Sequence, residues 1–226
     1  MVADTETVAD IAVHLPGAAR VFEARRIDYC CAGGSTLRDA CVRAHVAVED
    51  VVAELDALGA RKPPSWSSPG GLVAHIIEHH HAYARAAMDR LAPLARKVQR
   101  AHGEKHPELA RVVELFDSIV SELAPHLRAE EGALFPAILL MAQPACTGQR
   151  RAALRASVLV MQHDHDQLGR TLALLRATTG DYRPPEDACT SFRVLYAELE
   201  ALEADLHEHI HLENNVLLPQ ALGNPR

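Results

Sequence analysis

The chain has 226 residues, and its 30 acidic residues against 23 Lys and Arg give a formal net charge of -7. This length suits one domain of ordinary size, or one such domain with a small companion. A hydrophobic content of 48% excludes wholesale disorder, and an aromatic content of 4% favours helices over a β-sandwich. The acidic balance, with no long basic run, argues against nucleic acid as a partner.

The beginning of the chain, MVADTETVAD, has neither the basic nor the apolar region of a signal peptide. No apolar run approaches the roughly 18 residues of a membrane span, so a membrane partner is not expected. Five cysteines, an odd number, do not indicate a disulfide framework. We therefore expect a cytoplasmic protein.

In chain order, short helical stretches come first, then a segment rich in Pro, Ser and Gly, then four longer helical blocks. Four long helices with short connections favour an antiparallel four-helix bundle, so the predicted class is all-α. The predicted domains are a small N-terminal helical domain at 1–60, a linker at 61–71 and the bundle at 72–222. The four blocks lie at about 70–100, 105–141, 150–179 and 186–220.

Each block has apolar residues at alternating steps of four and three, the pattern of a helix with one buried face. Each of these ladders is interrupted by His or by His and Glu. The ladders are Ile77, His81, Ala84, Met88, Leu91, Ala95 and Val98; Val112, Phe116, Ile119, Leu123, His126, Glu130 and Ala133; Leu154, Val158, Met161, His165, Leu168, Leu172 and Leu175; and Leu195, Leu199, Leu202, Leu206, His209, Glu213 and Val216.

Four buried imidazoles and two buried carboxylates would cost several kcal/mol per charged group without partners, and metal ions would compensate that cost. The two HxxxE pairs place His and Glu on the same face of a helix. A hydrogen-bonded core histidine explains one interrupted ladder, but four interrupted together favour a metal centre. This set suits two ions of non-haem iron, or of manganese or zinc, with both carboxylates able to bridge. The predicted ligands are His81, His126, Glu130, His165, His209 and Glu213.

Two of these choices have competitors nearby. His80 also has an apolar ladder, but only the ladder through His81 stays apolar as far as Val98. His163 competes with His165, but its own ladder meets two arginines, which predicts an exposed side chain.

Four further side chains lie close to the predicted ligands in the sequence. Glu122 lies one turn before a ligand and Asp164 adjoins another, so either could orient an imidazole or move protons, or could be a solvated carboxylate. His207 and His211 point away from the ligand on their helix, and we expect them at the surface or beside a ligand.

The segment DYCCAGG at 28–34 contains adjacent cysteines, which make a poor structural disulfide. Because a Gly-Gly turn follows, we expect Cys30 and Cys31 to be accessible, as redox thiols or soft metal ligands. A pair of small half-buried residues near a turn is the alternative. We assign no functional role to the remaining cysteines, Cys41, Cys146 and Cys189.

These motifs together resemble the ScdA/YtfE-type repair-of-iron-centres family, in which a DYCC-bearing N-terminal domain precedes a hemerythrin-like four-helix bundle. The resemblance rests on DYCCAGG, on HLRAEEGALFP at 126–136, on VMQHDHDQLG at 160–169 and on HEHIHLENNVLLP at 207–219. It covers almost the whole chain. Ala32 departs from it, because a Gly often follows the Cys pair in the family.

The resemblance implies two iron ions, joined by an oxo or hydroxo bridge and by Glu130 and Glu213, on the six ligands named above. It implies repair of iron–sulfur clusters damaged by nitrosative or oxidative stress, through iron donation or through nitric oxide binding and reduction. Damaged iron–sulfur proteins, nitric oxide or oxygen, an electron donor and a second copy of the chain would be the partners. The alternatives are a hemerythrin-like protein that binds or senses oxygen or nitric oxide, and a helical interaction protein whose core histidines titrate.

Overall fold

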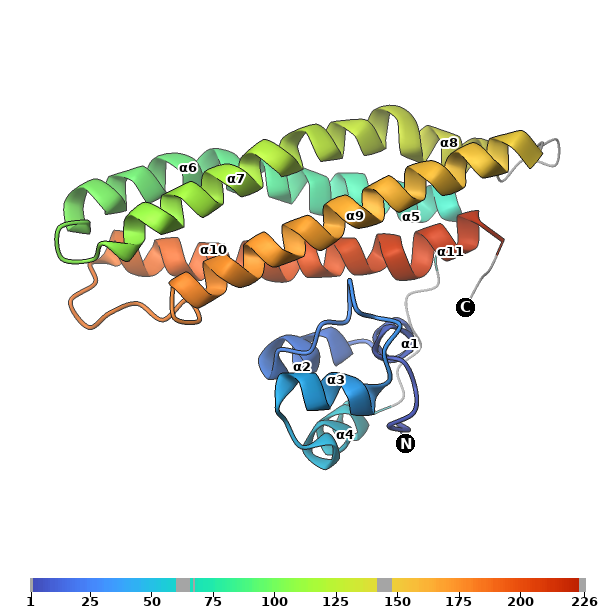
Figure 1. Cartoon of the computed structure of the whole chain (residues 1–226), viewed down its shortest axis with the longest axis horizontal. Helices are drawn as coiled ribbons and strands as arrows, with labels where there is room; N and C mark the ends of the chain where they lie inside the picture. Colours follow the sequence, from blue (N-terminus) through green and yellow to red (C-terminus); the bar gives the residue numbers. More distant parts are fainter. Residues whose placement is uncertain (1, 60–65, 67, 142–147, 224–226) are drawn as a thin grey trace. The chain divides into compact units, whose positions relative to one another are not determined.

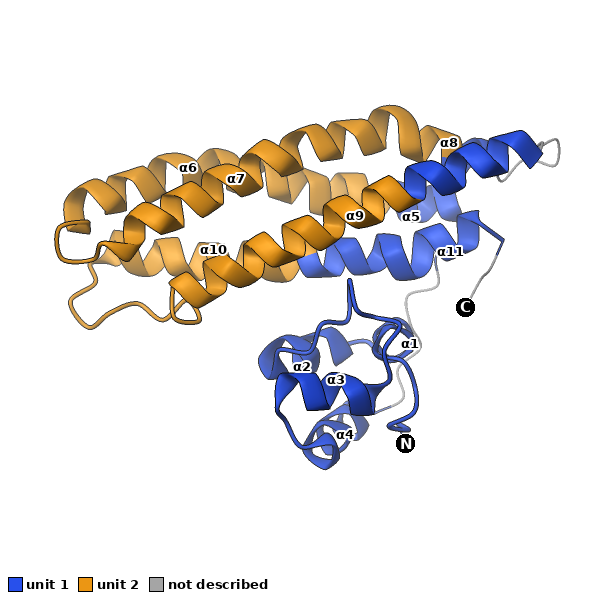
Figure 2. Ribbon diagram, in the orientation of Figure 1, with its two compact units in different colours: residues 1–74, 138–158, 207–226 blue, residues 75–137, 159–206 orange. Residues whose placement is uncertain are grey.

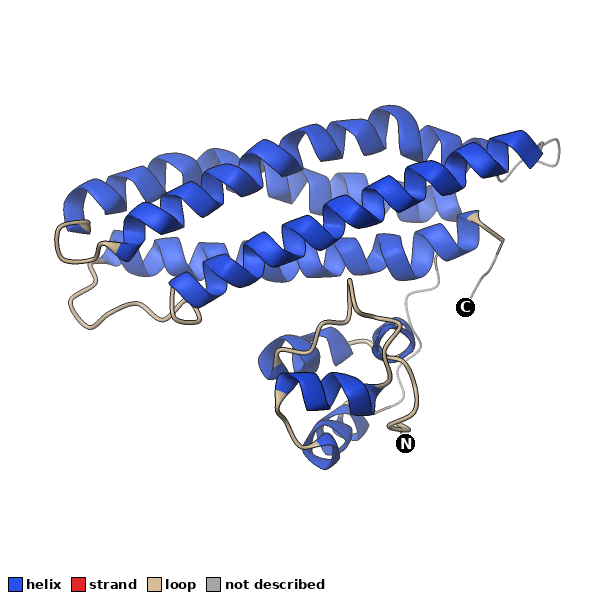
Figure 3. Cartoon of the chain, in the orientation of Figure 1, coloured by secondary structure: helices blue, strands red, loops and turns tan. Residues whose placement is uncertain are grey.

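The computed structural model describes residues 2–59, 66, 68–141 and 148–223, and these are predominantly helical (Figures 1 and 3). No strand occurs in these ranges; Thr7 and Thr36 form one isolated antiparallel bridge. The predicted all-α class is confirmed. Most of the predicted linker, at 61–65 and 67, lies outside the described residues, and its last three residues already belong to a helix.

Within the described ranges, four short helices come first and seven further helices follow, three of them preceded by a π-helical segment. The short helices are α1 (Val8–His14), α2 (Ala18–Arg25), α3 (Leu37–Ala44) and α4 (Val48–Ala57). The others are α5 (Pro69–His75), α6 (Ala82–His102), α7 (Glu108–Ala129), α8 (Phe135–Met141), α9 (Gly148–Thr178), α10 (Thr190–His211) and α11 (Leu218–Ala221). The π-helical segments are η1 (Ile76–His81), η2 (Glu130–Leu134) and η3 (Leu212–Leu217).

The chain groups into two compact units, which Figure 2 shows in different colours. Unit 1 joins Met1–Ala74 with Ile138–Val158 and His207–Arg226, and unit 2 joins His75–Ala137 with Leu159–Leu206. The domain boundaries at 60 and 72 stay a prediction. Among the described helices, none combines the length and the apolarity that a membrane span requires.

Unit 2 is a bundle of α6, α7 and the adjoining parts of α9 and α10. A turn at 103–107 connects α6 to α7, and these two helices pack against each other along their length. Ladder residues from each of the four helices form its interior, where each large apolar side chain contributes about 1.5–3 kcal/mol by leaving water. These buried residues include Met88, Leu91, Val98, Phe116, Ile119, Leu123, Leu168, Leu172, Leu175, Leu195, Leu199 and Leu202.

The predicted ladders are wrong by one residue beside the π-helical segments. Ile77 and Val216 are only partly buried and Ala133 is exposed, although all three were predicted on the buried face. A π-helical turn contains one residue more than an α-turn, so the buried face passes to an adjacent position. The residues buried in their place are Ile76, Leu134 and Leu217.

In unit 1 the four short helices enclose a small core of their own around Phe22, Tyr29 and Leu37. Two of these helices begin with the same cap, in which a threonine hydroxyl accepts a hydrogen bond from the N–H of the residue three positions on. Thr7 caps α1 and Thr36 caps α3, each at 3.1 Å. This explains how helices of seven and eight residues are held in place.

The DYCC segment packs against the C-terminal part of the same unit. Asn215 donates from Nδ2 to the carbonyl oxygens of Tyr29 and Cys30, each at 3.3 Å. The ring of His211 packs on that of Tyr29, with centroids 5.3 Å apart, and His207 Nδ1 lies 2.6 Å from Glu23 Oε1. His211 is 5% exposed, so of the two positions expected for it, at the surface or beside a ligand, the first is excluded.

The two adjacent cysteines differ in exposure. Cys30 is 5% exposed, so the expectation that both thiols are accessible holds only for Cys31, which is half-buried. Asp28 Oδ1 accepts hydrogen bonds from the N–H groups of Cys30 (3.1 Å) and Cys31 (2.9 Å). The Sγ atoms lie 3.7 Å apart. No disulfide joins the described cysteines, and Cys146 lies outside them.

We expect Gly33→Ala to lower the free energy of unfolding by about 1–3 kcal/mol, the usual cost of forcing extra atoms into a packed site. A Cβ at Gly33 would lie 2.7 Å from the carbonyl oxygen of Tyr29 and 2.8 Å from Cβ of Ala9. Gly34→Ala is the matched control, because a Cβ there meets nothing within 4 Å. Urea unfolding of both variants measures the difference. Equal midpoints would show that the turn yields without cost.

Candidate metal centre

Each of the four predicted ligand helices carries its ligands where the sequence places them, and π-helical segments lie at three of these places. His81 ends η1, Glu130 begins η2 and Glu213 lies in η3. His126 lies in the last turn of α7, His165 within α9 and His209 near the end of α10. Such single π turns occur frequently at functional sites because they change the direction of individual side chains.

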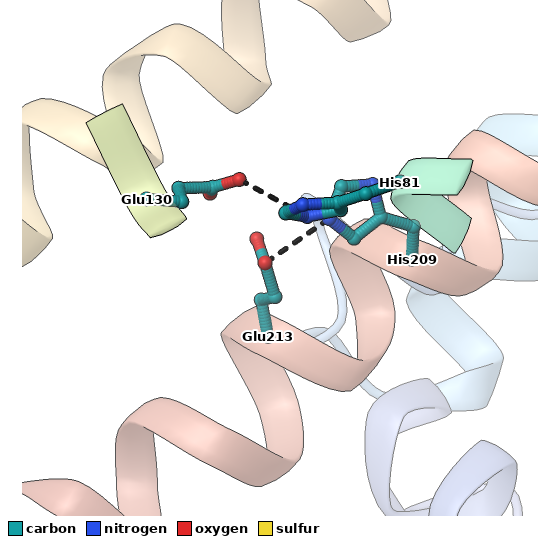
Figure 4. A group of neighbouring side chains, drawn as sticks. All are labelled: His81, Glu130, His209 and Glu213. Atoms are coloured by element: carbon teal, nitrogen blue, oxygen red, sulfur yellow. Dashed lines mark hydrogen bonds and ion pairs between the residues drawn. The ribbon is translucent and has the colours of Figure 1, made fainter. Parts of the chain in front are cut away.

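Glu130 is 2% exposed and is surrounded by imidazoles of its own unit. Its Oε1 lies 2.9 Å from Nε2 of His126 and 3.8 Å from Nε2 of His165. Its Oε2 lies 3.4 Å from Nε2 of His81 (Figure 4). None of these approaches has the geometry of a hydrogen bond. Burial alone would raise the pKa of Glu130, but the imidazoles outweigh it and hold that pKa well below its ordinary value.

Glu131, which the sequence analysis did not select, orients His81. Its Oε1 lies 2.7 Å from Nδ1 of His81 and 2.8 Å from Nη2 of Arg85. If Nδ1 carries the proton and donates it to Glu131, the lone pair of Nε2 points towards Glu130. A lone pair and a carboxylate oxygen repel each other unless a proton or a cation lies between them. In the sequence, the one sign that Glu131 belongs to the site is its position next to Glu130, a predicted ligand.

His80 has a different partner from His81. Its Nδ1 lies 3.0 Å from Oδ1 of Asp205, and the residue is 5% exposed. Of these two histidines, His81 is the one that lies against Glu130, which favours it as the ligand from the first block.

His126 and His165 face each other through their Nε2 atoms, 3.1 Å apart. Two imidazole nitrogens this close share one proton or direct both lone pairs at a cation. His163 is exposed, as predicted.

Glu122 and Asp164 do not bond to the imidazoles beside them. Asp164 Oδ2 is 3.8 Å from Nδ1 of His126, which is too far for a hydrogen bond, and Glu122 is exposed. Both line an open cavity of about 610 Å³, together with His126 and His165.

In unit 1, His209 and Glu213 form a second buried pair. Nε2 of His209 lies 3.0 Å from Oε1 of Glu213, and the residues are 1% and 0% exposed (Figure 4). The spacing of four residues brings both side chains to the same face, as the sequence predicted.

The donor atoms at these positions fit a metal ion. Imidazole nitrogen and carboxylate oxygen are the ligands of non-haem iron, manganese and zinc. Acceptor atoms face one another around Glu130 and between His126 and His165. A cation bound between them would relieve their repulsion. The side chains that could hold a metal are His81, His126, Glu130 and His165 in unit 2 and His209 and Glu213 in unit 1, with Asp28, Cys30 and Cys31 as a further group.

We expect Glu131→Ala to weaken metal binding about 10- to 100-fold, because a group that orients a ligating imidazole has an effect of this size. Burial alone would raise the pKa of Glu131, but His81 and Arg85 lower it, so the side chain is an anion at neutral pH. Competition with a chromophoric chelator measures the affinity. Glu114→Ala is the control, since Glu114 is exposed on α7 and its ion pair in the part of the molecule described is with Arg111. Equal affinities of the two variants would refute the role of Glu131.

Comparison with known proteins agrees with this fold and donor set. Residues 72–221 match the hemerythrin HHE cation-binding domain, and residues 4–59 match the ScdA N-terminal domain, a domain of unknown function. The fold and the buried His and Glu residues therefore place the chain in the class of helical proteins with a hemerythrin HHE domain.

Chains similar to this one include proteins named iron-sulfur cluster repair protein YtfE. The protein of that name from Pectobacterium atrosepticum is 32% identical over 222 residues, and that from Yersinia pseudotuberculosis is 33% identical over 223 residues. Each alignment covers 96% of both chains. The chain belongs to this YtfE family of iron–sulfur cluster repair proteins.

Proposed function

We propose that this protein repairs iron–sulfur clusters damaged by nitrosative or oxidative stress, and that it does so with two bound iron ions. The carrying observation is Glu130, a buried and ionised carboxylate with three imidazole nitrogens within 3.8 Å and no hydrogen-bond donor among the described residues. Relatives that match nearly the whole chain are named iron-sulfur cluster repair proteins, which supports the same function.

In this proposal the six predicted residues would hold both iron ions, with four imidazoles as neutral ligands and Glu130 and Glu213 as the carboxylates. One hemerythrin HHE match spans residues 72–221 and so includes all six, which supports this ligand set. Bound iron would supply redox-active positions for a diatomic ligand and ions that can be donated to a damaged cluster. The protein orients the ligands: Glu131 holds the proton of His81 at Nδ1, and Arg85 holds Glu131. At the cavity, the carboxylates of Glu122 and Asp164 lie beside the two imidazoles of His126 and His165.

The open cavity beside His126 and His165 also favours a second function, reversible binding or sensing of oxygen or nitric oxide. Its volume of about 610 Å³ far exceeds that of a diatomic molecule. Repair of a damaged cluster separates the two functions, because a carrier or sensor would bind the gas and restore nothing. Reduction of nitric oxide by the reduced protein would support an enzymatic route to repair.

We further propose that damaged iron–sulfur proteins are the partners and that the protein acts in the cytoplasm. The electron donor, the homodimer and a redox role for Cys30 and Cys31 stay predictions.

Reactivation of a damaged enzyme tests the proposal directly. An iron–sulfur dehydratase is inactivated with nitric oxide, the gas is removed, and iron-loaded wild-type protein is added with a reductant. We expect wild type and Glu114→Ala to restore dehydratase activity and Glu130→Ala to restore none beyond buffer. Cys30→Ser/Cys31→Ser is assayed in parallel to measure what the thiols contribute.

Two outcomes would contradict the proposal. Equal reactivation by wild type, Glu130→Ala and the double cysteine variant would exclude both the metal centre and the thiols from repair. Reversible gas binding by wild type with no reactivation would establish the carrier or sensor function in its place.

A further inference from the structure

A second group of potential metal ligands lies in unit 2, at the end of the bundle where α6 passes into α7 and the chain enters α10 (Figure 1). His102 Nε2 lies 3.1 Å from Sγ of Cys189. His106 Nε2 lies 3.1 Å from Oδ1 of Asp187. The pairs come from two short motifs, His-x₃-His and Asp-x-Cys, and the repair function proposed above uses none of them.

The surroundings of His106 resemble those of a ligating imidazole. Its Nδ1 lies 3.2 Å from Oε1 of Glu108, so carboxylates lie at both ring nitrogens. Metal-bound histidines usually donate their other N–H to a carboxylate, and this contact fixes which nitrogen carries the lone pair. With the proton on Nδ1 held by Glu108, the lone pair on Nε2 is directed towards Asp187.

The chain on both sides of the group is held in place. Arg193 donates from Nε to the carbonyl oxygen of Ala188 at 3.1 Å and from Nη2 to that of Glu186 at 3.0 Å. These two bonds hold the backbone on either side of Asp187 and next to Cys189. The side chains of Asp187 and Cys189 themselves are exposed. Both imidazole rings rest on Phe192, with centroids 5.5 Å and 5.4 Å from its ring.

We propose that His102, His106, Asp187 and Cys189 form a mononuclear zinc site. Two imidazoles, a thiolate and a carboxylate provide the four N, S and O ligands that zinc takes in tetrahedral sites, at about 2.0–2.3 Å. In the structure the ligand atoms form two pairs and the imidazole centroids are 6.5 Å apart. Binding requires rotation of the exposed side chains of Asp187 and Cys189 to bring the pairs around one ion. The ion would join the α6–α7 turn to the start of α10.

Cobalt, which replaces zinc in such sites and absorbs light, tests the proposal on the full-length, iron-loaded protein. We expect one cobalt ion per chain beyond the iron content, with a near-ultraviolet thiolate-to-cobalt charge-transfer band that zinc abolishes. Cys189→Ser removes this band and leaves the iron content unchanged. Cys41→Ser is the control, because it removes a thiol of unit 1 that belongs to none of the candidate metal groups, and the band persists.

The affinities give a second, graded result. We expect Glu108→Ala to weaken zinc binding about 10-fold, in the range found when a group that orients an imidazole is removed. His106→Ala, which removes a ligand, weakens it more, and circular dichroism verifies that each variant is folded. The proposal fails if no thiolate band forms, if the band survives in Cys189→Ser, or if His106→Ala binds zinc like wild type.

Discussion

We expect Glu130→Ala to reduce the iron bound per chain from about two ions to fewer than one, since two-iron centres in helical bundles depend on their bridging carboxylates. Glu130 lies within 3.8 Å of the Nε2 atoms of three histidines of unit 2. Alanine leaves these imidazoles without the negative charge between them. Both metal positions lose a ligand if Glu130 bridges them, so the loss is not confined to one ion.

Metal analysis by mass spectrometry, together with the ultraviolet–visible spectrum of protein purified in air, measures this effect. Glu114→Ala controls for the loss of one carboxylate and keeps the full iron content. Glu213→Ala is expected to behave like Glu130→Ala, because Glu213 is equally buried and lies 3.0 Å from Nε2 of His209. A Glu130→Ala protein that retained two irons would exclude this carboxylate as a bridge.

We expect Arg176→Ala to lower the free energy of unfolding by about 3 kcal/mol, at the lower end of the values for breaking a buried ion pair. Glu203 is 2% exposed and accepts from Arg176, at 2.9 Å from Nε and 2.7 Å from Nη2. The guanidinium also lies 5.0 Å from the ring centroid of Tyr182, a cation–π contact that the substitution removes. Without Arg176, the carboxylate of Glu203 stays buried and loses its counter-charge.

Urea unfolding of the metal-free protein measures this difference. Arg111→Ala is the control, since its pair with Glu114 is exposed and such pairs contribute only about 0–1 kcal/mol. The double substitution Arg176→Met/Glu203→Leu is expected to recover most of the loss, because it leaves no buried charge. If Arg176→Ala and Arg111→Ala unfold at the same urea concentration, the buried pair contributes no more than a surface pair.

Much of the bundle could be predicted because its helices repeat one simple pattern. The steps of four and three identified Leu154 to Leu175 in the third block without error, since α9 contains no π turn and each of these side chains is buried. The pattern failed beside η1, η2 and η3, where Ile76, Leu134 and Leu217 are buried in place of their predicted neighbours. Whether a π turn forms depends on the contacts of its side chains in the folded protein. The spacing of apolar residues along the sequence contains no information about those contacts.

The sequence by itself determined the fold class, the family and the six candidate ligands, because each rests on spacing along one helix or on a short motif. Tertiary structure decided which groups surround them. Glu131 lies against His81 across a separation of 50 residues. Asn215 reaches Tyr29 across 186 residues, and His102 reaches Cys189 across 87. Helical periodicity relates residues three or four positions apart on one helix, whereas these contacts arise only when segments far apart in the sequence pack together.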